Sequence, residues 1–77
     1  MSFSETEYVI EAAADIVTRI RVELTAHGMD YDSSTRVQTP TITEFRVTIR
    51  NNDELERVRS LRNSLHLKIY PSLPSTI

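Results

Sequence analysis

The chain has 77 residues, of which 39% are hydrophobic and 26% are charged, and these values are typical of one small globular domain. Because it contains no cysteine, disulfides, thiolate nucleophiles and cysteine-ligated metal sites are excluded. Small secreted domains usually depend on disulfides, and the sequence has neither a run of about 18 apolar residues nor a basic and apolar leader at its N-terminus. We therefore expect a cytoplasmic protein, in a host cell or in a virus-infected one.

The net charge of −2 conceals an uneven distribution along the chain. Residues 1–35 carry seven acidic side chains and two arginines, whereas residues 36–77 carry seven basic side chains and four acidic ones. A chain with two oppositely charged halves can pair with copies of itself, or it can present its basic half to an acidic partner. A mixed and solvated surface explains the same distribution equally well.

The first predicted element is a long amphipathic helix. Ser4 and Glu7 have the spacing of a capping box, and acidic side chains crowd the first turn, where the helix dipole favours them. Apolar residues then recur with a period of about 3.6, at Val9, Ala13, Ile16, Ile20 and Leu24. Gly28 can take the left-handed conformation that ends a helix, and Met29 can fold back onto the last turn. This pattern predicts a helix over residues 5–27.

A polar segment and a strand are expected next. Residues 29–40 are rich in turn-forming side chains, and a short strand is expected near residues 35–39, before Pro40. In residues 41–50, apolar and polar side chains alternate with period two. The side chains on the apolar face are those of Thr43, Phe45, Val47 and Ile49. The alternation predicts a strand with one buried and one wet face, as in an antiparallel sheet that helices cover on one side.

The last third of the chain predicts a second helix and a final strand. Asp53 and Glu56 have capping-box spacing at the start of the helix. A narrow apolar stripe follows, made of Leu55, Val58, Leu61 and Leu65. Leu67 and Ile69 then alternate with polar residues, which predicts a short strand, and we expect residues 71–77 to form a loose tail.

These elements predict the order αββαβ. Two amphipathic helices and a small sheet bury their apolar faces most economically when both helices lie on one face of the sheet. We therefore predict one α+β domain over residues 1–70, with an antiparallel or mixed sheet of about three strands and two helices packed on one face.

No group of residues has the spacing of a metal, cofactor or catalytic site. His27 and His66 stand far apart, and the first is explained by a helix end and the second by the wet face of a strand. Asp30 and Asp32 begin like an EF-hand loop, but the glycine and the glutamate that such a loop requires are missing. The single glycine, Gly28, ends a helix, so no phosphate-binding loop is present. We therefore expect no enzyme, no cofactor, no metal and no small-molecule substrate.

The remaining candidate site is a set of basic side chains. Arg46 and Arg50 are four residues apart on the predicted strand and share its outer face, where Lys68 of the last strand can join them. Arg59 and Arg62 are three residues apart on the second predicted helix and also share a face. Such sets can neutralise phosphates, although no aromatic stacking platform accompanies them. These five residues are the predicted contacts with duplex DNA or with a protein partner.

Residues 39–47, Thr-Pro-Thr-Ile-Thr-Glu-Phe-Arg-Val, resemble a strand of the FtsK/SpoIIIE DNA translocases. The small α-domain that precedes the motor of that family carries the pattern Gly-Pro-x-Ile/Val-Thr-Arg-Phe/Tyr-Glu-Leu. Four positions of this chain match the pattern in register: Pro40, Ile42, Thr43 and Phe45. The predicted flanking helices are also similar to those of the family, so the resemblance covers about residues 8–70. The sequence departs from the pattern where Glu44 replaces the family's arginine, and it has no counterpart of the motor.

The resemblance implies an assembly module without catalytic activity, because the α-domain of this family forms part of a ring around duplex DNA. It implies that the chain forms a homo-oligomer or docks on a translocase ring, with the five basic residues as contacts. The alternative is a small viral or accessory protein that binds and modulates a host protein without contacting DNA, with Tyr31, Tyr70 and the prolines as anchors. Neither hypothesis involves a membrane. A steep loss of binding with added salt would favour phosphate contacts, and a weak dependence would favour a protein interface.

Overall fold

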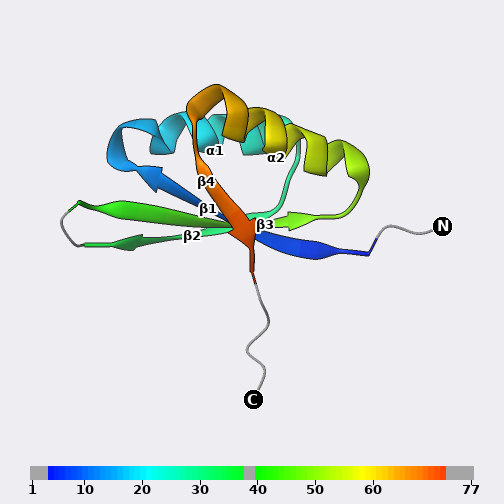
Figure 1. The fold of residues 1–77 in the computed structure, drawn as a ribbon, viewed down its shortest axis with the longest axis horizontal. Helices are drawn as coiled ribbons and strands as arrows, with labels where there is room; N and C mark the ends of the chain where they lie inside the picture. The colour runs from blue at the N-terminus through cyan, green and yellow to red at the C-terminus, as the bar shows by residue number, and fades with distance from the viewer. Residues whose placement is uncertain (1–3, 38–39, 73–77) are drawn as a thin grey trace, which may run out of the picture.

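A four-stranded antiparallel sheet forms one layer of the structure, and two helices lie together on one of its faces (Figure 1). The computed structural model describes residues 4–37 and 40–72. The elements, in chain order, are β1 (Thr6–Ala13), a short 3-10 turn (Ala14–Ile16), α1 (Val17–Ala26), β2 (Tyr31–Arg36), β3 (Ile42–Ile49), α2 (Asn52–Leu65) and β4 (Lys68–Pro71). The strands are arranged in the order β2-β3-β1-β4. The order βαββαβ with this strand arrangement is the split βαβ, or ferredoxin-like, topology.

The prediction of a small α+β domain with both helices on one face is therefore confirmed. The predicted number of strands is approximately right, and the predicted first element is wrong. The sheet has four strands rather than about three, and the chain begins with a strand rather than with a helix. Both differences come from residues 6–13, because β1 lies between β3 and β4 and completes the sheet.

The helix predicted over residues 5–27 exists only in its second half. β1 pairs with β3 along its whole length, from Thr6 opposite Ile49 to Ala13 opposite Ile42, and no helix begins at the predicted capping box. β1 is a central strand, so its side chains on either face lie between those of β3 and β4. Ile10 is buried beneath the helices, and Val9 is buried on the other face. Ala13, which the helical stripe would bury, is exposed.

The end of α1 follows the prediction closely. Ile20 and Leu24, the last two members of the apolar stripe, are fully buried. Gly28 has a positive φ of 64°, and its N–H donates to the Thr25 carbonyl over 3.0 Å. The Met29 N–H then donates to the Leu24 carbonyl, also over 3.0 Å, and its side chain is buried. Glycine is suited to this left-handed turn because it has no Cβ to crowd the backbone.

The hairpin of β2 and β3 is partly as predicted. Thr43, Phe45, Val47 and Ile49 are all buried on the helix side of β3, as the period-two pattern required. The strand before it was placed too late, because β2 covers Tyr31–Arg36, and residues 38 and 39 lie outside the described residues. β2 is held through its ladder to β3, by the edge-to-face packing of Tyr31 on Phe45 (5.6 Å between centroids) and by a 3.1 Å hydrogen bond between the Thr35 and Thr43 hydroxyls.

The second helix begins earlier than predicted, and it ends at Leu65, the last residue of the predicted apolar stripe. Asn51 rather than Asp53 caps α2, since its side-chain oxygen accepts from the Glu54 N–H over 2.9 Å and the Glu54 carboxylate accepts from the Arg50 N–H over 2.8 Å. His66 was expected on the wet face of the last strand, but it ends α2 in the left-handed conformation, with a φ of 55°.

The C-terminal strand is shifted by one residue. β4 covers Lys68–Pro71, and the Ser72 N–H donates to the Glu7 carbonyl over 2.8 Å, so the sheet reaches into the segment expected to be a loose tail. The rest of that tail, residues 73–77, lies outside the described residues. No helix within the described ranges is long and apolar enough to cross a membrane.

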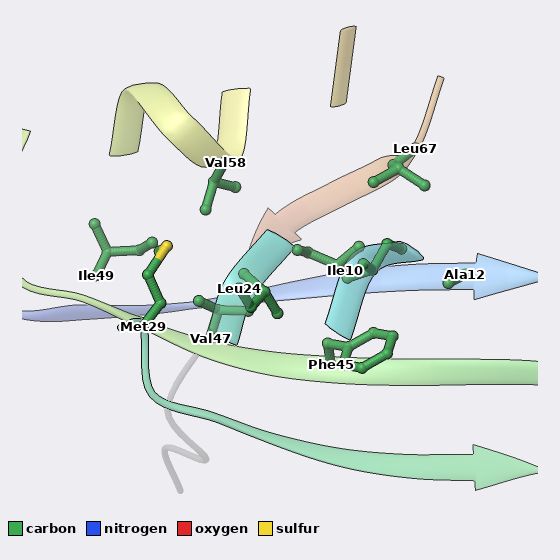
Figure 2. Close-up of a cluster of buried hydrophobic side chains, with 10 residues drawn as sticks. Ile10, Ala12, Leu24, Met29, Phe45, Val47, Ile49, Val58 and Leu67 are labelled. Carbon is green, nitrogen blue, oxygen red and sulfur yellow. The ribbon is translucent and has the colours of Figure 1, made fainter. Parts of the chain in front are cut away.

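The core lies between the sheet and the two helices. Figure 2 shows Phe45 and Val47 of β3, Ile10 of β1, Leu24 of α1 and Val58 of α2 gathered in one cluster. Half-buried apolar side chains, among them those of the α2 stripe, pack around this cluster. The helices thus cover one face of the sheet, and the chemistry of the molecule's surface depends on what the opposite face and the edges carry.

Candidate functional site

The face of the sheet opposite the helices, which we call the open face, is covered by no other described element (Figure 1). Because side chains alternate along each strand, the register places a defined set on it. The central strands contribute Glu7, Val9, Glu11, Ala13, Ile42, Glu44, Arg46 and Thr48, and the edge strands contribute Asp32, Ser34, Arg36, Lys68 and Tyr70. Seven of these thirteen side chains are acidic or basic, so the open face is predominantly charged.

Two carboxylates stand at its centre. Glu11 of β1 lies directly opposite Glu44 of β3, and their side chains are only 20% and 16% exposed. Like charges directly opposite each other on neighbouring strands repel. The Arg36 guanidinium of β2 compensates, with Nη2 3.2 Å from a Glu44 carboxylate oxygen and 3.7 Å from one of Glu11. A single arginine therefore bridges two partly buried carboxylates.

Tyr70 of β4 completes this network from the other side. Its hydroxyl donates to the Glu11 carboxylate over 2.9 Å. That hydrogen bond raises the pKa of the Tyr70 phenol, and desolvation of the phenol and the negative charges of Glu11 and Glu44 raise it further, whereas Arg36 opposes them. The Lys68 ammonium lies 6.0 Å from the centroid of the same ring. The charged and polar groups of this network are therefore paired with one another within the same chain.

The five predicted contact residues are not brought together. Arg46 and Lys68 lie on the open face, but Arg50 follows the end of β3 and pairs with Asp30. Arg59 and Arg62 lie on α2, in the helical layer, where they line a hollow of about 200 Å³. The basic residues are therefore divided among three parts of the surface.

Most of these cations already have an acidic neighbour. Arg46 lies 3.7 Å from a Glu7 carboxylate oxygen and also donates to the Ser72 hydroxyl over 3.4 Å. Arg59 lies 3.6 Å from Glu56 on the same helix. The sequence could not reveal the Arg46–Glu7 pair, because Glu7 was assigned to a helix and is brought beside Arg46 only by the pairing of β1 with β3.

A groove between α1 and α2 has a volume of about 540 Å³. His27 at the end of α1 accepts at Nε2 from an Arg57 guanidinium N–H over 3.3 Å and lies 3.8 Å from a Glu23 oxygen. Asp53 and Glu56 add further negative charge. The sequence placed His27 at a helix end but could not predict its contact with Arg57, because α1 and α2 are far apart in the sequence. Within residues 4–37 and 40–72, no three acidic or histidine side chains are grouped as metal ligands would be.

The tyrosines expected to anchor a partner are engaged within the domain. Tyr31 packs edge-to-face on Phe45, and Tyr70 is hydrogen-bonded to Glu11. What sequence reasoning missed is the edge strand β2 itself, whose residues Asp32 to Arg36 are all exposed.

The geometry defines a small α+β domain of the split βαβ type. No protein-family model matches the sequence, and the search of the curated proteins found no relative. Among solved structures, the chain is similar to a protein titled "De novo designed protein Foldit4", with a TM-score of 0.52 and 13% sequence identity. The match covers 95% of this chain and 97% of the designed one. At this identity the similarity describes the fold and carries no function.

Proposed function

We propose that the chain is a non-catalytic assembly module that binds protein surfaces, forming or docking on a DNA-associated oligomer as the resemblance to the translocase α-domain implies. The observation that supports this most directly is the pairing of charges on the open face. Arg36 is matched by Glu44 and Glu11, and Arg46 is matched by Glu7. A surface that binds phosphates needs cations in excess, whereas a surface with both signs suits a protein partner with complementary charges.

Direct contact with duplex DNA has weaker support. Among the five candidate residues, Lys68 and Arg62 are the two without a carboxylate within 4 Å in the described ranges, and they lie in different layers. Two separated cations release few counterions, so any DNA affinity should be low and should fall with salt by a slope of about −2 at most. On this reasoning the module is near DNA because of its partners.

The test is the solution mass by light scattering, at low and at high salt, together with the fluorescence anisotropy of a labelled DNA duplex. We expect self-association that grows with protein concentration, and DNA binding that is weak or undetected at physiological salt. A chain that stays monomeric and binds duplex DNA with a steep salt dependence would contradict the proposal. A monomer without DNA affinity would also count against self-assembly and would favour the alternative of an accessory protein that binds a different host protein.

A further inference from the structure

The two edges of the sheet differ in how well they are protected from another strand. β4 is four residues long and carries Lys68 and Pro71, which are features that discourage edge-to-edge pairing. β2 is six residues long and has neither lysine nor proline. Its residues Ser33 and Thr35 are exposed although they point to the side on which the helices lie, so the helical layer does not cover this strand. β2 is therefore the open edge of the sheet.

The hydrogen bonds of the hairpin show which backbone groups point outward. The Thr48 N–H donates to the Asp30 carbonyl over 3.0 Å, and this pair continues the register of β2 on β3. In an antiparallel ladder, bonded and non-bonded pairs alternate, so even-numbered residues of β2 direct their N–H and C=O groups toward β3. Tyr31, Ser33 and Thr35 consequently direct theirs toward the open edge, where a further strand can bind them.

We propose that β2 pairs with β2 of a second copy of the chain, antiparallel and centred on Ser34, so that two four-stranded sheets join about a two-fold axis. This register is the one in which Ser33 exchanges backbone hydrogen bonds with Thr35 of the other copy. It places Asp32 of each copy opposite Arg36 of the other, in a non-bonded pair where side chains approach most closely. The contact is isologous, since each residue pair occurs twice.

The side chains of β2 complement themselves in this register. Asp32 is exposed, and no hydrogen bond or ion pair within the described ranges engages its carboxylate. The Arg36 side chain is 47% exposed and has capacity for a third carboxylate beside Glu44 and Glu11. The register also sets Val37, which is 88% exposed, opposite Tyr31 of the other copy. An exposed valine beside an aromatic ring is a favourable cross-strand pair, so a side chain without a role in the monomer gains one.

This inference deepens the proposed function by naming the self-associating surface and its register. The interface is a single strand pair, which is at the small end of protein interfaces, so we expect a weak and concentration-dependent dimer. Larger assemblies would then use other surfaces, such as the open face.

Disulfide cross-linking can test this register, because the chain has no cysteine and one substitution therefore provides a single thiol. Ser34→Cys places the thiol on the two-fold axis, with the two Cα atoms about 4.5 Å apart, within the range of a disulfide. Ser33→Cys is the matched control, since it lies one residue away and would face Thr35 of the other copy. In a glutathione redox buffer we expect on the order of tenfold more cross-linked dimer from Ser34→Cys, measured by mass spectrometry without reduction.

A second set of variants tests the charges. Asp32→Arg makes the edge positive and Arg36→Asp makes it negative, so each should weaken self-association on the order of tenfold in sedimentation equilibrium. An equimolar mixture of the two should regain the dimer, because each then faces the opposite charge. Asp15→Arg, at an exposed position in the turn before α1, is the charge-matched control and should leave association unchanged.

The outcomes separate this inference from the proposed function. Cross-linking that is equal at the two positions, or an oligomer that Asp32→Arg leaves intact, would overturn the β2 pairing while self-assembly through another surface stands. A wild-type chain that stays monomeric at all concentrations would overturn the β2 pairing and would restrict the proposed function to docking on a different protein.

Discussion

Glu11, Glu44 and Arg36 form a group in which each side chain depends on the other two. The carboxylates lie opposite each other on neighbouring strands, and the guanidinium is within 4 Å of both. Loss of the arginine would leave two partly buried negative charges without compensation. Substitutions in this group should therefore change the stability of the fold.

Arg36→Gln should lower the free energy of unfolding by about 1 kcal/mol, because it leaves Glu11 and Glu44 to repel each other. Adding Glu44→Gln to the same chain should recover most of the loss. Urea denaturation at low protein concentration measures both effects on the monomer. Arg46→Gln is the control, since its ion pair with Glu7 is about half exposed on both sides and should contribute close to nothing. Equal losses in Arg36→Gln and Arg46→Gln would show that the bridge has no special role.

The raised pKa of Tyr70 predicts a dependence of stability on alkaline pH. The ordinary tyrosine value is 10.0, so the hydrogen bond to Glu11 stabilises the folded state fully below that pH, and the stabilisation is lost as the pH rises through the higher folded pKa. Titration of the phenolate absorbance should show one tyrosine above its ordinary range that disappears in Tyr70→Phe. Glu11→Gln should return that tyrosine toward 10.0, because the carboxylate is the main cause of the shift. A titration unchanged in Glu11→Gln would contradict the assignment.

A helix or strand was predicted correctly where its hydrophobic pattern fits only one type of secondary structure. In β3 the period-two alternation and the β-branched residues agreed, and its buried face was predicted correctly. In β1 the apolar positions Ile10 and Ala12 fit a strand as well as a helix, and the choice is made by the partners β3 and β4, which lie more than 25 residues away. β2 was placed too late because its residues 32–36 are all polar, so it has no hydrophobic period to detect.

Gly28 lies in the turn between α1 and β2, with its backbone in the left-handed region. Gly28→Ala should cost about 1 kcal/mol of unfolding free energy, because alanine is disfavoured at a φ of 64°. A Cβ at this position would meet no atom within 4 Å, so the loss is conformational and not steric. Gly28→Asn should therefore cost less, since asparagine tolerates the left-handed region. Thermal unfolding of the three chains gives the order, and an asparagine variant as unstable as the alanine one would contradict this explanation.

In the folded molecule, the acidic residues 1–35 and the basic residues 36–77 do not form two separate charged halves. The acidic N-terminal segment became a central strand, which brings Glu7 and Glu11 beside the arginines of β3 and β2. The five candidate contact residues are all exposed, but their spacing in the sequence could not show that sheet order would pair Arg46 with Glu7 and separate it from Arg59 and Arg62. The outer edge of β2, where its backbone N–H and C=O groups point away from β3, is paired with no other described strand.

If β2 pairs with a second copy, the stability of the chain must depend on its concentration. A partner that binds only the folded state adds about 1 kcal/mol when its concentration reaches about fivefold above the dissociation constant. For a domain of this size that corresponds to a rise in melting temperature of about 4–8 °C. Ser33→Pro should abolish the rise, because it removes an N–H that points to the open edge and leaves the ladder to β3 intact. Its melting temperature should match that of the dilute wild-type chain, whereas Ser34→Pro, which removes a bond to β3, should melt lower at every concentration. A wild-type melting temperature independent of concentration would contradict the pairing directly.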